Sequence, residues 1–159
     1  MKRRIVLCVM AVLLTFPAYA QLGNLIKSVQ NSPLLTQQNT VRDTISRLTN
    51  IKNAFTKMPL NQGKLSFVTA ALPLLNQAYS LSGDILGMFQ KNKTLDPVQA
   101  NKMSGLLGEI ENLAAQKGNT APLAQAQVGE ANQKIQQATR ILTNILGNEG
   151  GLLKSLLQK

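Results

Sequence analysis

An apolar stretch at residues 65–89 constrains the fold of this chain more than any other part of its sequence. Its apolar residues recur every three or four positions and would cover most of a helix, which must then be surrounded by other elements. They are Leu65, Val68, Ala71, Leu72, Leu74, Leu75, Ala78, Tyr79, Leu81, Ile85, Leu86, Met88 and Phe89. Polar residues such as Asn76 and Asp84 interrupt the stretch, whereas a transmembrane helix needs about 18 nearly uncharged apolar residues. The pattern predicts the central helix of a soluble bundle.

The first twenty residues have the pattern of a secretory signal peptide. Basic residues at positions 2–4 precede an apolar run at 5–14, and Ala18 and Ala20 provide the small-x-small pattern of a signal peptidase site. A membrane anchor would need an apolar core roughly twice as long. We therefore expect cleavage after Ala20, so that the mature protein begins at Gln21, and a single domain over residues 21–159. The expected location is the periplasm, with secretion or association with the cell surface as alternatives.

The composition after residue 20 limits the chemistry that the protein can perform. Cleavage removes three of the 17 basic residues and none of the seven acidic ones, which leaves a net charge of +7. No cysteine or histidine remains, which excludes the usual serine and cysteine triads, zinc-hydroxide sites, haem attachment and blue-copper sites. The acidic residues are dispersed, so no pair is placed for glycosidase chemistry. We expect a protein that is not an enzyme, with no catalytic residue, metal or cofactor.

Four long helices account for most of the remaining sequence. Helical spacing and end signals place them at about 33–58, 64–91, 97–117 and from 119 to about 147. The clearest start is Asp96 followed by Pro97, an N-cap with proline at the first helical position. Shorter amphipathic segments lie at 22–29 and 151–159. The sequence predicts an all-α antiparallel bundle of about four long helices plus short N- and C-terminal helices.

Two features of the central helix invite a structural interpretation. Pro73 lies inside it, and we favour a kinked continuous helix over two helices that meet at Leu72, because the apolar spacing passes through the proline unbroken. Gly83 and Gly87 lie four residues apart, and we expect them to allow the close approach of a neighbouring helix.

The last long helix contains a heptad pattern. Seven apolar or small residues alternate at spacings of four and three, namely Ala124, Val128, Ala131, Ile135, Ala138, Leu142 and Ile145. The small residues indicate close contact with another helix. Spacing alone leaves two alternatives open, a seam inside the bundle or a homodimer interface through residues 124–145.

The C-terminal residues 151–159 are expected to form a hinged amphipathic tail. Gly150 and Gly151 precede a leucine-rich face that is flanked by lysines. The candidate contact residues are Leu152, Leu153, Lys154, Leu156 and Leu157. One interpretation is a capping helix that folds back over the open end of the bundle, and the other is a tail that docks on a partner protein or a lipid surface.

The basic residues do not form a nucleic-acid site. They are scattered, and Lys57, Lys91 and Lys117 fall near helix C-termini, where they interact favourably with the helix dipole. We therefore expect no nucleic-acid partner. The leading hypothesis is an exported, non-enzymatic protein that binds another envelope protein as an adaptor, chaperone-like protein or accessory subunit of a secretion machine. The alternatives are a protein that binds anionic membrane surfaces through its tail, and a small-molecule binder with a cavity near Pro73, Gly83 and Gly87.

Overall fold

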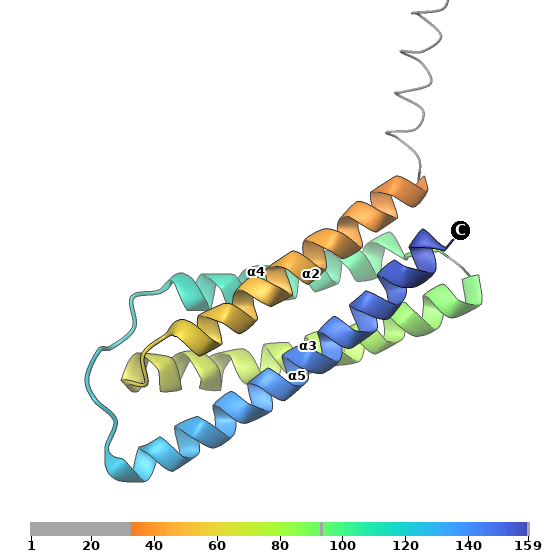
Figure 1. The fold of residues 1–159 in the computed structure, drawn as a ribbon. Coiled ribbons are helices and arrows are strands. Elements are labelled where there is room, and N and C mark those ends of the chain that lie inside the picture. Colours follow the sequence, from red (N-terminus) through yellow and green to blue (C-terminus); the bar gives the residue numbers. More distant parts are fainter. Residues whose placement is uncertain (1–32, 93, 159) are drawn as a thin grey trace, which may run out of the picture. The chain divides into compact units, whose positions relative to one another are not determined.

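The computed structural model describes residues 33–92 and 94–158, and it confirms the all-α bundle. The described residues form four helices and no strand: α2 (Pro33–Lys57), α3 (Gln62–Asn92), α4 (Pro97–Ala115) and α5 (Gln125–Leu157) (Figure 1). The predicted signal peptide, its cleavage site at Ala18, Ala20 and Gln21, and the short helix at 22–29 lie outside the described residues.

The chain divides into two compact units, residues 1–36 and 37–159. Of the first unit, the described residues 33–36 belong to the first turn of α2. The second unit contains the rest of α2 and all of α3, α4 and α5. The core and the contacts between helices described below belong to the second unit.

Helices α3 and α5 run side by side in the same direction. Three side-chain hydrogen bonds join residues at a nearly constant separation along the two helices: Gln62 to Gln127 at 2.7 Å, Lys134 to Thr69 at 3.0 Å, and Asn148 to Ser82 at 3.0 Å. Consecutive helices reverse direction, as predicted, so α3 and α5, which are separated in the chain by α4, point the same way (Figure 1). A parallel pair of neighbours requires a connection that returns along the bundle, and α4 provides it.

Helix α2 contacts its neighbours through long side chains. Gln38 donates a hydrogen bond to the carbonyl of Leu156 at 3.2 Å, and Lys52 donates to Thr143 at 3.4 Å, which makes α2 antiparallel to α5. The backbone of α3, in contrast, approaches those of both α4 and α5 within 8 Å along much of its length. Helix α3 is therefore the helix with the closest neighbours, as the apolar stretch predicted.

The core lies between the four helices. Phe55 of α2 and Phe67 of α3 stack with their ring centroids 4.5 Å apart. The largest fully buried side chains come from every helix: Val41, Leu48, Ile51, Phe55, Leu75, Met103, Leu107, Ile110, Leu142, Ile145, Leu152 and Leu156. The central stretch is not enclosed on all sides, however, because Tyr79 is 43% exposed and Met88 is 37% exposed.

Several helix signals read from the sequence are confirmed. Helix α3 continues through Pro73, which decides between the two alternatives in favour of one continuous helix. Asp96 caps α4, its Oδ1 accepting a hydrogen bond from the Val98 amide at 2.9 Å, and Pro97 occupies the first helical position. The start of α5 was predicted too early, because residues 116–124 are not helical. Pro122 explains part of this difference, since a proline disfavours helical backbone in the residue before it.

The predicted hinge before the C-terminal tail is wrong. Helix α5 continues without interruption through Gly147, Gly150 and Gly151 to Leu157. Leu152 and Leu156 are each only 1% exposed, so the tail is part of the core. Each glycine costs a helix about 1 kcal/mol, whereas burial of a leucine contributes about 1.5–3 kcal/mol. The burial of the two leucines therefore offsets the low helix propensity of the glycines, which had suggested a break in the helix.

The predicted close approach at Gly83 and Gly87 is also wrong. A Cβ atom added at either position would meet nothing within 4 Å outside its own helix. The close glycine contact lies elsewhere, between Gly63 at the start of α3 and Gly118 after α4. A Cβ at Gly63 would lie 2.9 Å from the Cα of Gly118, and one at Gly118 would lie 2.8 Å from the Cα of Gly63.

Alanine substitutions at Gly63 and Gly83 test this assignment. Gly83→Ala should raise the free energy of unfolding by about 0.5–1 kcal/mol, because alanine is the better helix former and the space is open. Gly63→Ala should lower it by about 1–3 kcal/mol, because the new methyl group would overlap backbone atoms that cannot rotate away. Urea unfolding of both variants measures the difference. Equal effects at the two positions would contradict the glycine contact.

Candidate functional site

The segment between α4 and α5, residues 116–124, crosses one end of the bundle and caps α3. Its backbone is extended at both ends, with φ −67° and ψ 131° at Gln116 and φ −64° and ψ 151° at Ala124. The carbonyl of Asn119 accepts a hydrogen bond from the Gly63 amide at 2.7 Å, and that of Ala121 accepts one from the Gln62 amide at 3.0 Å. The first amides of a helix have no partner within it. The crossing segment supplies two of the missing acceptors.

Side chains complete the caps at this end. Oδ1 of Asn61 accepts a hydrogen bond from the Lys64 amide at 2.9 Å. Oε1 of Gln127 accepts one from the Ala124 amide at 3.1 Å and another from Nε2 of Gln62 at 2.7 Å. A single amide oxygen therefore caps the start of α5 and joins it to α3. These bonds fix the crossing segment against the two helices.

A pocket of about 520 Å³ lies where α4 ends and the crossing segment begins. One wall is formed by the first turns of α3, a second by the last turn of α4, and a third by the connection between α2 and α3. The lining residues are Met58, Pro59, Asn61, Gly63, Ser66, Phe67, Ala70, Leu113, Gln116, Lys117, Gly118 and Thr120. Because an extended segment is narrower than a helix, it leaves the outer face of α3 uncovered at the exposed residues Ser66 and Ala70.

Charge at the pocket comes from lysines. Lys117 is the one charged side chain among the described residues that line it. Lys64 lies directly behind the wall, only 7% exposed, and its Nζ donates a hydrogen bond to the carbonyl of Met58 at 2.8 Å. Burial lowers the pKa of the Lys64 ammonium from its ordinary value. The pocket therefore combines an apolar wall with positive charge.

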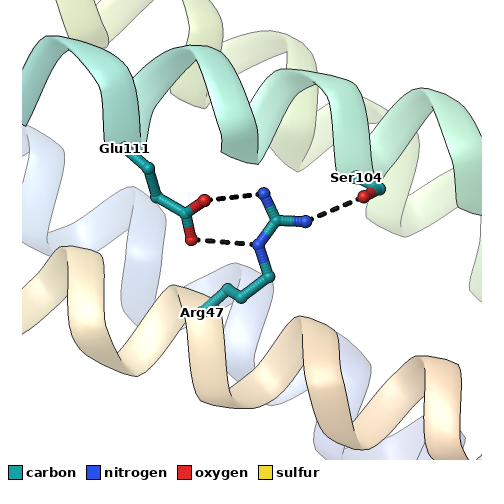
Figure 2. Close-up of polar contacts among 3 residues, drawn as sticks. All are labelled: Arg47, Ser104 and Glu111. Atoms are coloured by element: carbon teal, nitrogen blue, oxygen red, sulfur yellow. Dashed lines mark hydrogen bonds and ion pairs between the residues drawn. The ribbon is translucent and has the colours of Figure 1, made fainter.

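An ion pair ties α2 to α4 away from the pocket (Figure 2). Arg47 donates from Nε to Oε1 of Glu111 at 2.9 Å and from Nη2 to Oε2 at 2.7 Å, and its Nη1 donates to Oγ of Ser104 at 2.8 Å. The hydrogen bonds from Arg47 hold the pKa of the Glu111 carboxyl below its ordinary value. We assign this cluster a structural role, because all its polar partners are supplied by the fold.

A double-mutant cycle on Arg47 and Glu111 measures what this pair contributes. We expect a coupling energy of about 0.5–1 kcal/mol from Arg47→Met, Glu111→Gln and the double variant, since the pair is bidentate but partly exposed. The coupling should decrease at high salt. Acid should remove it as well, because the contribution of Glu111 is lost when the pH falls through its lowered pKa. Denaturant unfolding gives the four energies, and a coupling of zero would contradict the assignment.

Glu149 is the one described carboxyl that the fold buries. It is 3% exposed and lies on the inner face of α5, and desolvation raises its pKa to about 7. Its pKa is thus shifted in the opposite direction to that of Glu111. No group of three or more potential metal ligands occurs among the described residues, so Glu149 does not belong to such a cluster.

The burial of Glu149 predicts that stability decreases as the pH rises. The unfolded chain releases this proton near the ordinary glutamate pKa of 4.5, whereas the folded protein holds it up to about pH 7. Between these values the folded state binds more protons, so the free energy of unfolding falls with pH, by about 3 kcal/mol in all, and then levels off. Glu149→Gln should remove this slope and stabilise the protein at about pH 8.

Urea unfolding across this pH range measures the effect, with Glu109→Gln on the exposed side of α4 as the control. An unchanged slope in Glu149→Gln would show that the carboxyl is not desolvated.

The residues singled out from the sequence do not line the pocket. Leu152 and Leu156 are buried in the core, Leu153 is half-buried, and Lys154 and Leu157 are exposed. Pro73 is exposed on α3, and Pro73, Gly83 and Gly87 are not among the residues that line the pocket.

The heptad residues of α5 pack inside the protein's own bundle. Ala131, Ala138, Leu142 and Ile145 are buried within the protein's own bundle. The small residues face a close neighbour, as predicted, and that neighbour is α3. The interior alternative therefore accounts for the seam, which leaves these four residues covered without a second copy.

Sequence reasoning missed the residues that form the pocket. Phe67 belongs to the predicted central helix, and the structure shows that it is buried in the core and also lines the pocket. Gly118 directly follows the helix predicted at 97–117, and nothing in its sequence context points to Gly63. The polar segment after Gly118 was the one available signal, since it was assigned to the start of a helix despite containing a proline.

Comparisons with known proteins add no further assignment. No family model, curated protein or solved structure matches the chain. Within the described ranges, no helix combines the length and apolar character needed to cross a membrane.

Proposed function

We propose that this protein is an exported, non-enzymatic helical bundle that binds a partner protein of the bacterial envelope through the pocket at the start of α3. The observation that carries the proposal is the pocket itself, about 520 Å³ in volume and walled by Met58, Phe67 and Leu113. The N-terminal pattern at residues 1–20 supports export. Through this surface the protein would act as an adaptor, a chaperone-like protein or an accessory subunit of a secretion machine.

The pocket is held open by interactions that do not depend on a ligand. The hydrogen bonds from Gln62 and Gly63 to the crossing segment and the contact between Gly63 and Gly118 fix two of its walls. A site whose walls are already ordered loses little conformational entropy when a partner binds. Apolar anchors that enter such a site contribute most of the binding energy at typical protein interfaces.

A protein partner agrees with the apolar surface beside the pocket. Leu60 lies between the lining residues Pro59 and Asn61, and it is 41% exposed. An occupant that filled only the pocket would leave this leucine in water. A partner protein has a surface large enough to cover both.

The pocket volume favours a second candidate function. A cavity of about 520 Å³ falls within the range of small-molecule sites. The small-molecule alternative therefore moves from Pro73, Gly83 and Gly87 to the pocket. The membrane-surface alternative loses its main support, because the leucines expected to contact lipid, Leu152 and Leu156, belong to the core.

Filling the pocket tests the proposal. Ala70 is exposed and lines the pocket, so Ala70→Trp should block it without disturbing the core. Asn101→Trp on the exposed side of α4 is a matched control outside the pocket. The mature protein with a photo-crosslinking residue at position 66 is used to recover partners from envelope extracts. We expect a specific protein to be crosslinked by the wild type and by Asn101→Trp and lost with Ala70→Trp.

Equal recovery with both tryptophan variants would contradict binding through the pocket. Recovery of no protein by any variant, together with a thermal shift of the wild type by a small apolar compound, would favour the second candidate.

A further inference from the structure

Three lysines belong to the pocket or to residues next to it. Lys117 lines the pocket, Lys57 directly precedes the lining residue Met58, and Lys64 is bonded to the carbonyl of Met58. None of the described lining residues is an aspartate or a glutamate. The described lining residues therefore offer a positive side chain and no negative one.

The acidic residues closest in sequence to this end of α4 and α5 are already paired. Glu111, two residues before the lining residue Leu113, is bonded to Arg47 at 2.7 Å. Glu130, in the second turn of α5, is bonded to Lys134, also at 2.7 Å. Neither carboxylate is therefore available to neutralise Lys57, Lys64 or Lys117.

Lys64 adds a buried positive charge behind the pocket wall. An ammonium group has three N–H donors, and the hydrogen bond to Met58 uses one of them. Its surroundings disfavour the charged form, which is why burial lowers its pKa. A carboxylate bound nearby would have the opposite effect and would stabilise the ammonium.

We propose that the pocket selects an acidic segment of its partner protein, one in which an apolar side chain enters the pocket and flanking carboxylates lie beside Lys57 and Lys117. This inference rests on the proposed function, since it names the chemistry of the partner at the same site. It also assigns a role at the pocket to some of the basic residues that are scattered along the sequence.

The lysines should contribute only modestly to affinity, and their contribution should depend on the salt concentration. Exposed charge pairs contribute little to affinity individually, and salt screens them. Complementary charge acts mainly on partner choice and on the association rate. The apolar anchor therefore determines whether a segment binds, and the lysines determine which segment binds best.

Three peptides separate these two contributions. They share one core of leucine and phenylalanine, have blocked ends, and are flanked by glutamates, glutamines or lysines. Binding to the isotope-labelled mature protein is followed by the amide signals of Ser66, Ala70 and Lys117. We expect the glutamate peptide to bind about tenfold more tightly than the lysine peptide, with the glutamine peptide between them. The difference should shrink as the salt concentration rises from about 0.05 to about 0.5 M.

Charge reversal at the pocket provides the matched test. Lys117→Glu should remove or invert the preference for the glutamate peptide. Lys154→Glu makes the same change on the exposed side of α5, outside the pocket, and should leave the preference intact. Both variants have the same net charge, so a general effect of protein charge would appear in both.

The outcomes distinguish this inference from the proposed function. Equal affinities for the three peptides, with shifts at the pocket, would overturn the charge selectivity and leave pocket binding intact. Pocket signals that respond to none of the peptides would contradict both. Tighter binding of octanoate than of the glutamate peptide, at the same signals, would overturn a protein partner in favour of an anionic lipid.

Discussion

The amide groups at the start of α3 are the constraint on which this structure depends. A helix start in the interior of a bundle end needs acceptors for its free amides, and here the crossing segment supplies them through the carbonyls of Asn119 and Ala121. The backbones can come this close only because Gly63 and Gly118 lack side chains. The start of α5 is positioned at the same place, because Oε1 of Gln127 accepts hydrogen bonds from the side chain of Gln62 in α3 and from the amide of Ala124 just before α5.

The position of α3 explains why the connection before α5 is long and extended. Helix α3 packs closely against both α4 and α5, whereas α4 and α5 are not close neighbours, so the chain must cross the end of α3 to reach α5. Ala71 and Ala78 of α3 and Ala131 and Ala138 of α5 are fully buried, which lets the two backbones approach closely. Helix α2 instead uses large side chains such as Phe55 and Leu48 to reach the core.

Local signals in the sequence predicted the helices, and contacts between distant residues account for what they missed. Asp96 and Pro97 identify the start of α4 because a cap is formed within a few residues. Gly150 and Gly151 misled because helix propensity is weak, and the burial of Leu152 and Leu156 outweighs it. The pocket and the contact between Gly63 and Gly118 join residues that lie far apart in the sequence, and spacing along one helix contains no information about such pairs. The burial of Glu149 likewise depends on how the other helices pack on α5, and the sequence of α5 alone does not contain this information.

Phe67 connects the stability of the protein with its proposed binding site. It stacks on Phe55 at 4.5 Å and is almost fully buried, yet it also forms part of the pocket wall. Three other pocket positions, Ser66, Ala70 and Thr120, are exposed and contribute little to the core. Changes at these exposed positions can therefore alter what the pocket accepts without loosening the bundle. Phe67 cannot vary in this way, because a smaller residue would leave a cavity next to Phe55 and cost about 3–5 kcal/mol. The apolar floor of the pocket is thus fixed by the demands of folding, whereas its exposed rim is free to vary.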